Sequence, residues 1–519
     1  MLSVIRGQAL IKLISAYCQL LLIVFCFSAL WFSVWSARRQ LWAEWRLIPR
    51  SYLLGLVFLI LVPAVFYTYG MVPKHVIEDE AYYQLAAKNI LTSGHLGDLP
   101  KSGGWAFLIF LGYLLESINN YVSIQISQCL GAGAIVGIFF LAVWAGLSLR
   151  TALIGAALFA LVPARMFWAA TGESHTASIF FVIWAAAFSF LCYRRSHRQI
   201  FWLAVSVWVF AGLVRSETVL IGLFFLLCMP LFVPRPTRKD LPIFSALCWS
   251  AMILMPQMIQ EIRHALQGHW VVTGSNISVE NLLHNTAIYG TGFLIGQVHP
   301  VLLTLLAMLG FGVIFRRERK LAVVLTGWLF LLPLMYFSIW FQNYGESAGI
   351  LMKTRLFVFF YPPLVLFAAG GIVWLADKYG FRHKVLAAAG LCGIVVAWSC
   401  FYYRHYPLGK DQFVLEMRMV DEIKQTVSPK DLAVACFPQA FTGVLPSLMA
   451  TDIGWFLQEP VWRRTAFQKA HKVYLIDDMY SQRKCRESVA LIKQKGKAVV
   501  VQQWTQKKVR YGVYSLAGF

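Results

Sequence analysis

Charge is scarce in this chain. Only 13% of its 519 residues are charged, whereas 59% are hydrophobic and 15% are aromatic. A soluble globular protein carries about 25% charged residues, so the composition excludes that class. Many runs of about 17–25 mostly uncharged residues match a hydrocarbon core of roughly 30 Å. The sequence therefore predicts a polytopic membrane protein.

Acidic residues are scarcer than basic ones, with 24 Asp and Glu against 46 Lys and Arg and a net charge of +22. The cations stand in short clusters between apolar runs. This is the positive-inside pattern, and it needs no nucleic-acid partner. All the clusters fall on one side when the predicted spans are counted alternately, so we expect these loops to be cytoplasmic: 38–50, 194–198, 235–239, 316–320 and 378–384.

Signal-peptide and metal-site patterns are also missing. No small-residue cleavage site follows the apolar run 15–36, so we expect a span there and no cleaved signal peptide. The sequence contains no CxxC or Cys/His spacing of the kind that indicates a metal site. Eight of the ten cysteines lie within or beside apolar runs, where Cys behaves as a small hydrophobe. The other two, Cys436 and Cys485, could pair if the polar tail is extracytoplasmic.

The predicted fold class is an all-α polytopic membrane domain of about 12 spans with a C-terminal extracytoplasmic α/β domain. An apolar segment at 105–116 is too short to cross. We expect spans at 15–36, 51–69, 121–147, 151–168, 174–192, 200–214, 217–233, 242–258, 298–315, 322–341, 356–375 and 385–401.

The predicted domains are 1–50, with one span and a basic loop, 51–403, with the remaining spans, and 404–519. The last is large enough to hold its own core. Its alternation and turn signals predict helices at 413–427 and 486–495, the second ending at Gly496, and strands at 432–437, 472–477, 498–501 and 511–516.

An acidic cluster, Glu78, Asp79 and Glu80, stands in the external loop 70–104. Carboxylates beside a membrane need partners, because desolvating their charge is costly. One interpretation is structural: Asp79 caps a helix, Glu80 suits its positive end, and Gly94 ends it. The other is chemical, since a carboxylate held in a loop that lines a pocket can act as general base toward a hydroxyl.

The motif Asp79-Glu80-Ala-Tyr-Tyr83, followed by Gly94 and by Leu-Pro-Lys101 before an apolar segment, resembles the first external loop of GT-C glycosyltransferases. The likeness is strongest to protein mannosyltransferases and aminoarabinose–lipid A transferases, which use polyprenyl-phosphate-linked sugars. It covers roughly 50–375 and extends to Glu173, to the stretch 212–217 and to the stretch 355–362.

The chain departs from the family pattern twice. Ser102-Gly103 replaces a Pro-Pro pair after Lys101, and the span 15–36 is additional to the one that leads into the loop. The additional span places the N-terminus outside.

The resemblance implies an inverting transfer with Asp79 as general base, and with Glu80 and Glu173 supporting it or binding sugar hydroxyls. The leaving phosphate has a second pKa near 6, so it needs no dedicated acid. Lys101 and Arg355 would hold the lipid phosphate. The alternative for both cations is anchoring at the membrane interface.

Further candidates lie in two other external turns. Glu173 precedes a predicted helix, so capping is its alternative role. We expect Arg215 and Glu217 to bind substrate or to pair with other loops, because residues two apart on a helix do not face each other. Tyr83 and His175 either line the same cavity or pack locally.

A divalent cation, Mg²⁺ or Mn²⁺, could be bound by oxygens of the acidic cluster. The histidines of the loop 259–297 and His299 lack ligand spacing, so we infer no metal from them.

Two other classes stay open. A secondary transporter would also have about 12 spans, but transporters place ionisable residues in broken helices near the bilayer midplane. An O-antigen ligase or polymerase would centre on a large loop, for which 259–297, with Arg263, His264 and His269, is the candidate. The favoured partners are a lipid-linked sugar donor and a glycan, lipid or protein acceptor outside a bacterial inner membrane.

Overall fold

The structure, a computed structural model, describes most of the chain. The described residues are 2–69, 77–96, 102–116, 118, 121–195, 197–228, 279–280, 282–283, 285–287, 299–339, 358–379, 390, 393, 423, 425–428, 430–436, 449–458, 470, 472–477, 485–506 and 509–517. Within these ranges the description of some stretches, 77–79 among them, covers the backbone only.

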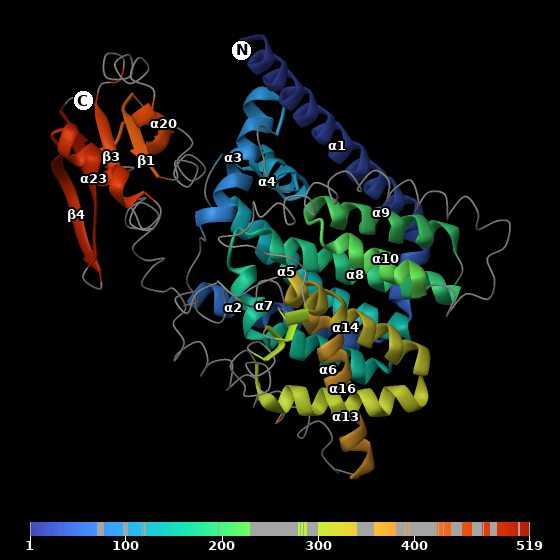
Figure 1. The fold of residues 1–519 in the computed structure, drawn as a ribbon. Coiled ribbons are helices and arrows are strands. Elements are labelled where there is room, and N and C mark those ends of the chain that lie inside the picture. Colours follow the sequence, from blue (N-terminus) through green and yellow to red (C-terminus); the bar gives the residue numbers. More distant parts are fainter. Residues whose placement is uncertain are drawn as a thin grey trace.

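The first 379 residues are helical wherever they form regular structure in the described ranges (Figure 1). The helices are α1 (Leu2–Arg46), α2 (Arg50–Tyr69), α3 (Ile77–Ser93), α4 (Gly104–Leu115), α5 (Val122–Ala145), α6 (Leu149–Leu161), α7 (Pro163–Ala169), α8 (Ser174–Arg195), α9 (Arg198–Val214), α10 (Thr218–Cys228), α13 (Val301–Arg317), α14 (Arg319–Ile339) and α16 (Tyr361–Lys378).

The chain is an integral membrane protein. Among the described residues, four helices are long and apolar enough to cross a bilayer: Tyr17–Arg46, Val122–Ala145, Ser174–Arg195 and Val358–Lys378. This does not confirm the predicted count of about 12 spans. The predicted span 242–258 lies outside the described residues, and 385–401 lies almost wholly outside them.

Two predicted spans differ from the observed helices. The run 15–36 is part of the much longer α1, because its flanking residues are also good helix formers. The run 151–168 is divided between α6 and α7. Val162 leaves the helical conformation with ψ near 119°, and Pro163 follows. Proline restricts the preceding residue to extended backbone and has no N–H to continue the hydrogen-bond ladder, so the helix ends there.

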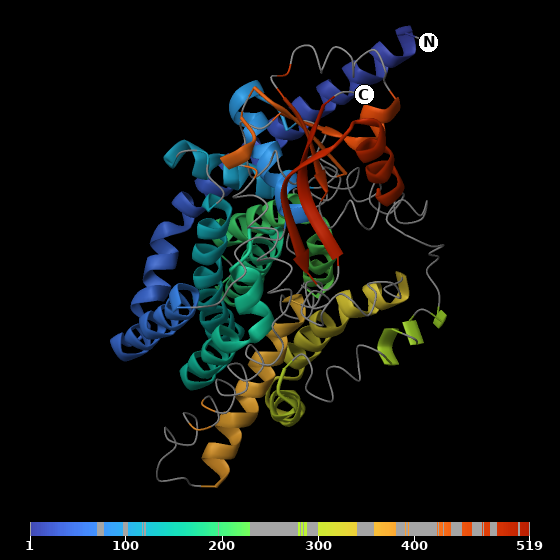
Figure 2. The ribbon, with the colours of Figure 1, turned by 90° about the vertical axis from the view of Figure 1, so that its left-hand side faces the viewer.

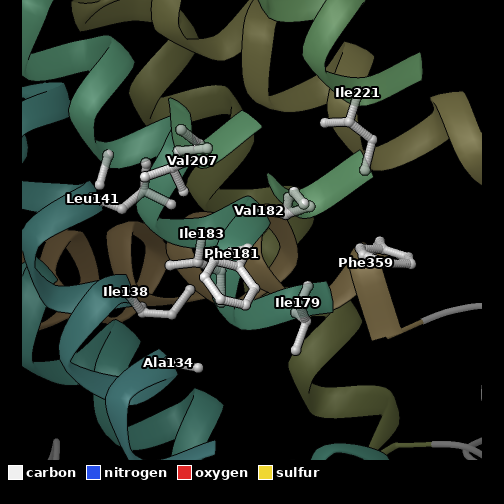
Figure 3. Packing of buried hydrophobic residues seen from close by; sticks show 14 of the residues in the cluster. Ala134, Ile138, Leu141, Ile179, Phe181, Val182, Ile183, Val207, Ile221 and Phe359 are labelled. Atoms are coloured by element: carbon white, nitrogen blue, oxygen red, sulfur yellow. The ribbon is translucent and has the colours of Figure 1, made fainter. Parts of the chain in front are cut away.

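The centre of the helical region is packed with aliphatic and aromatic side chains, shown in Figure 3. Ala134, Ile138 and Leu141 of α5 face this core together with Ile183 of α8 and Val207 of α9, and all are buried. The α5–α8 and α8–α9 pairs are neighbours along much of their length. This packing holds the ends of α5, α8 and α9 in a fixed relation, and the candidate site is built on those ends.

Helix α1 connects distant parts of the fold (Figure 2). With 45 residues it is about 68 Å long, more than a bilayer requires. It packs along α9, where Ser33 Oγ lies 3.0 Å from Ser206 Oγ. Towards its N-terminal end, Tyr17 donates its hydroxyl hydrogen to the Ser93 carbonyl at 3.2 Å. The additional N-terminal helix thus supports both α3 and α9.

The C-terminal region forms a five-stranded sheet in the order β2-β1-β3-β5-β4. The strands β1, β2 and β3 are parallel, while β5 is antiparallel to β3 and β4. The elements are β1 (Leu432–Ala435), β2 (Met449–Asp452), α20 (Ile453–Gln458), β3 (Val473–Asp477), α23 (Arg486–Lys495), β4 (Val499–Gln506) and β5 (Val509–Leu516).

Most of the predicted tail elements are confirmed. The strands at 432–437 and 472–477, the helix 486–495 and the two last strands are observed, although β4 and β5 are longer than predicted. The prediction missed β2 and α20, because Met449-Ala-Thr-Asp452 is short and contains only one β-branched residue. The predicted helix 413–427 lies mostly outside the described residues. Val434, Ile453, Phe456 and Leu475 form a separate core.

Cys436 and Cys485 form a disulfide bond, as the sequence allowed. The bond joins the end of β1 to the start of α23. Disulfides persist in oxidising compartments and are rare in the cytosol. An extracytoplasmic tail fits this bond.

We expect Cys436→Ser to destabilise the tail region by about 2–4 kcal/mol, because the disulfide restricts the unfolded chain. Urea-dependent proteolysis of the membrane-embedded protein would measure the loss. Cys18→Ser, which removes an exposed free thiol on α1, is the matched control. Equal protease resistance of the Cys436 variant and the wild type would show that the disulfide contributes no stability.

Candidate active site

The acidic cluster lies at the start of α3. The helix begins at Ile77, so Asp79 is within its first turn and the expectation that it is the N-cap is wrong. Residues 77 and 78 are already helical, so the N-cap residue of α3 must precede Ile77. The predicted end at Gly94 is confirmed, since that residue has φ of 70°. The side chain of Asp79 lies outside the described side chains.

Glu80 is buried, with 1% of its surface exposed. Its Oε1 accepts hydrogen bonds from Gln84 Nε2 at 2.8 Å and from Ser123 Oγ at 2.9 Å. Gln84 Nε2 also lies 3.1 Å from Ser123 Oγ. We call Glu80, Gln84 and Ser123 the carboxylate clamp. It joins α3 to α5, so the geometry favours a supporting role for Glu80 over direct contact with a sugar.

Gly172 presses against the carboxylate clamp from the loop before α8. A Cβ atom at this position would fall on Glu80 Oε1 and lie 2.5 Å from Ser123 Oγ. Only a residue without a side chain allows the loop backbone to approach this closely. The close approach brings the start of α3 against the segment that carries Glu173.

We expect Gly172→Ala to lower both thermal stability and activity, because overpacking typically costs about 1–3 kcal/mol. Thermal unfolding in detergent and turnover would be measured together. Gly312→Ala is the matched control, because nothing lies within 4 Å of the added methyl group. Gly94→Ala is unsuitable as a control, because the positive φ at that position would strain an alanine. A Gly172→Ala protein as stable and as active as wild type would contradict the tight packing.

The segment 168–175 is fixed by contacts from α3 and α4 and by a contact within the segment itself. Trp105 Nε1 of α4 donates to the Gly172 carbonyl at 2.7 Å. Tyr83 of α3 donates its hydroxyl hydrogen to Ser174 Oγ at 3.3 Å. The Trp168 ring stacks on His175 with 4.6 Å between centroids. Since these groups are buried, they hold the Glu173 turn in one position.

A chain of polar contacts runs from Glu173 to Glu217. Arg215 Nη1 lies 2.7 Å from His175 Nε2, and His175 Nδ1 lies 3.6 Å from Glu173 Oε2. An arginine has no acceptor, so His175 Nε2 accepts and the ring proton of the neutral imidazole sits on Nδ1, facing Glu173. We call Glu173, His175, Arg215 and Glu217 the external polar chain.

Arg215 and Glu217 pair directly, which corrects the expectation that they meet other partners only. Arg215 Nη2 donates to Glu217 Oε1 at 2.8 Å, and Nε donates to Oε2 at 3.1 Å. The expectation assumed helical spacing. The backbone of Arg215 is instead extended, with φ of −158° and ψ of 118°, between α9 and α10. The Arg215–His175 contact shows that the predicted link to another loop also exists.

The structure thus brings six of the predicted residues together at one end of the helical bundle: Glu80, Tyr83, Glu173, His175, Arg215 and Glu217. The backbone of Asp79 belongs to the same helix start. Lys101 and Arg355 lie outside the described residues, as do Arg263, His264 and His269.

Several contributors were not predicted. Gln84 and Ser123 stand in helical patterns with no motif, although Gln84 is one turn after Glu80, a spacing at which side chains meet. Trp105 and Trp168 read as ordinary apolar residues in the sequence.

Arg165 of α7 is buried in the bundle and was also missed. It donates to the carbonyls of Ala160 at 2.9 Å and Gly131 at 3.1 Å. Because Pro163 interrupts the helical ladder, the α6 end has carbonyls to satisfy, and Arg165 supplies donors. Its role is structural in this arrangement.

The divalent cation expected at the acidic cluster would be bound partly by Glu78 and Asp79, whose side chains lie outside the described side chains. The third carboxylate, that of Glu80, accepts hydrogen bonds from Gln84 and Ser123. Among the described residues no group of three His, Cys, Asp or Glu side chains could hold a metal.

Two crystal structures of ArnT from Cupriavidus metallidurans superpose on the chain. The one bound to undecaprenyl phosphate has a TM-score of 0.55 at 13% identity, over 88% of this chain and 97% of that chain. The apo state has a TM-score of 0.56 at 12% identity over the same shares. The predicted GT-C fold is therefore confirmed.

An oligosaccharyltransferase from Archaeoglobus fulgidus, tethered with an acceptor peptide, superposes with a TM-score of 0.48 at 13% identity, over 90% of this chain and 74% of that chain. No protein-family model matches the sequence, and no curated protein matches it.

Proposed function

We propose that the protein is an inverting membrane glycosyltransferase that moves a sugar from a polyprenyl-phosphate donor to an acceptor outside the cytoplasm. The observation that carries the proposal is the meeting of the α3 start, the Glu173 turn and the Arg215–Glu217 pair at one end of the bundle. The fold supports it, since ArnT with this fold was solved bound to undecaprenyl phosphate.

In this proposal Asp79 is the general base. Position 79 is one helical turn before Tyr83, and residues four apart lie on the same helix face. Tyr83 contacts Ser174, next to Glu173. Helix geometry therefore favours an Asp79 that serves the space beside the external polar chain, while Glu80, about 100° around the helix, supports the helix through Gln84 and Ser123.

The proposed reaction needs a single base. The acceptor hydroxyl gives its proton to Asp79 as its oxygen attacks the anomeric carbon. The bond from that carbon to the phosphate oxygen breaks on the opposite face, so the configuration inverts and polyprenyl phosphate leaves. One carboxylate with cations for the phosphate suffices, unlike the carboxylate pair of glycoside hydrolases.

Two cations complete the proposed site. Lys101 and Arg355 would stabilise the charge that develops on the leaving phosphate, as fixed cations do in phosphate sites. The guanidinium of Arg215 is bound by Glu217, so we assign it to holding His175 and Glu173 in place. Glu173 would then contact the sugar or the acceptor.

The proposed topology has about 12 spans in a bacterial inner membrane, with the site and the tail outside. The Cys436–Cys485 bond supports an oxidising location for the tail. The acceptor in this setting is a glycan, a lipid or a protein of the cell envelope.

The sequence left a Mg²⁺ or Mn²⁺ ion open, and we propose that the reaction needs neither. We expect the purified protein to keep its turnover in EDTA, because one carboxylate with fixed cations for the phosphate is sufficient for the transfer. Turnover would be measured before and after chelation. Loss of turnover in EDTA with recovery in Mg²⁺ or Mn²⁺ would show that a cation is required.

Mass analysis of lipids and surface glycans from cells with and without the gene tests the proposed function. We expect one glycan or lipid species to lose a sugar in the deletion strain, with a matching excess of polyprenyl-phosphate sugar. Unchanged glycans together with altered solute uptake would favour a transporter.

A further inference from the structure

A cavity of about 470 Å³ opens at the other end of the bundle from the candidate site. Its walls come from the turn between α5 and α6, the end of α13 and the end of α16. Helix α5 separates it from the carboxylate clamp: Ser123 is near the first residue of this helix, and the cavity adjoins its last. With 24 residues, α5 is about 36 Å long.

The charge pattern of the sequence places this cavity on the cytoplasmic side. The basic clusters 316–320 and 378–384 flank the ends of α13 and α16 that form its walls. Tyr52 and Trp374 also line it. Aromatic residues of these types gather where a membrane meets water, so the cavity lies at the depth of the inner-leaflet headgroups.

Charged side chains of both signs line the cavity. Arg150 and Arg317 carry positive charge, while Glu318 and Asp377 carry negative charge. Arg150 Nη1 lies 3.8 Å from Asp377 Oδ1, longer than the 2.7–2.9 Å of a charge-assisted hydrogen bond. An arginine has five N–H donors in a planar fork, so Arg150 can attract Asp377 and still bind a phosphate.

We propose that this cavity binds the headgroup of a zwitterionic phospholipid, a phosphate joined to a primary ammonium. The phosphate would contact Arg150 and Arg317, and the ammonium would contact Asp377 and Glu318. Among the described lining residues the two positive and two negative charges balance, which matches a headgroup with no net charge. A purely anionic headgroup would meet two carboxylates. The volume lies in the range of about 300–1,000 Å³ of ligand sites.

The inference is independent of the proposed glycosyltransferase activity. If these arginines only anchored the helices at the interface, they would attract any phosphate-bearing lipid to the same extent. A preference of the protein for one lipid headgroup over another would therefore indicate a formed binding site, whereas equal binding of both lipids would indicate interfacial anchoring.

Native mass spectrometry of the purified full-length protein tests the proposal, with delipidated protein added to micelles of phosphatidylethanolamine or phosphatidylglycerol. We expect about tenfold greater retention of phosphatidylethanolamine, the loss of that excess in Arg317→Gln, and a shift towards phosphatidylglycerol in Asp377→Asn. Arg316→Gln is the matched control, because both arginines are exposed but only Arg317 lines the cavity.

Equal retention of the two lipids, or equal effects of Arg316→Gln and Arg317→Gln, would overturn the proposal. Soluble O-phosphoethanolamine provides a third measurement. If it displaced the lipid at the same concentration as phosphatidylethanolamine itself, the cavity would bind a soluble phosphoamine, and the assignment to a lipid would fail.

Discussion

Asp79→Asn is expected to reduce sugar transfer by about 10²–10⁴-fold while the protein still inserts and folds, because a general base contributes a factor of this size. The amide keeps the shape of the carboxylate but cannot take the acceptor proton. Turnover would be measured on protein purified in detergent, with thermal unfolding as the check on folding.

Glu78→Gln is the matched control for Asp79→Asn. It removes the same charge from the neighbouring position of α3, about 100° around the helix. We expect its turnover to remain close to that of wild type. Near-normal transfer by the Asp79→Asn protein would remove Asp79 from the mechanism, and an equal loss in both variants would indicate a general effect of charge.

Arg215→Gln is expected to lower both stability, by about 2 kcal/mol, and turnover, because it removes a bidentate contact to Glu217 and the contact to His175. The Arg215 side chain is only 14% exposed, so solvent cannot fully replace these contacts. We expect the double variant with Glu217→Gln to lose less than the sum of the two single losses, since the residues share one interaction.

An exposed ion pair in the same protein provides the comparison for Arg215. Arg195 Nε lies 2.8 Å from Glu44 Oε1, but the Arg195 side chain is 49% exposed. Surface pairs of this kind contribute about 0–1 kcal/mol. Arg195→Gln should therefore leave stability and turnover nearly unchanged. Equal effects of the two arginine variants would show that the external polar chain has no special role.

The sequence predicted which residues lie on the same face more reliably than how they interact. Charge clusters between apolar runs placed Glu173, Arg215 and the acidic cluster on one side, and the contacts from Tyr83 to Ser174 and from His175 to Arg215 agree with this. Pairing within the Arg215–Glu217 turn was missed because it depends on an extended backbone at one residue. Hydrophobic periodicity does not report such local conformations.

The contacts of Glu80 could not be predicted. The resemblance implied that Glu80 supports Asp79 or binds sugar hydroxyls, but the sequence did not indicate that its carboxylate meets Gln84 and Ser123. Ser123 is 43 residues away along the chain. A contact of this kind depends on how α3 packs on α5, which is a property of the tertiary structure.

The two departures from the family pattern are connected in space. A Cβ at Gly103 would lie 2.8 Å from Ile23 Cδ1 of α1 and 2.8 Å from Leu96 Cδ1. A side chain at position 103 would therefore meet the ends of the Ile23 and Leu96 side chains, the first of which belongs to the additional helix α1. Loss of Pro-Pro after Lys101 is consistent with accommodation of α1.

Transfer by the purified protein in proteoliposomes tests the central claim most directly. The vesicles would contain lipid extract from the source cells as the supply of polyprenyl-phosphate sugars and acceptors. Mass spectrometry would follow the donor over time. We predict that wild type converts a polyprenyl-phosphate sugar into polyprenyl phosphate and that Asp79→Asn does not. A donor pool that stays unchanged with folded wild-type protein, while a solute crosses the same vesicles, would contradict the account.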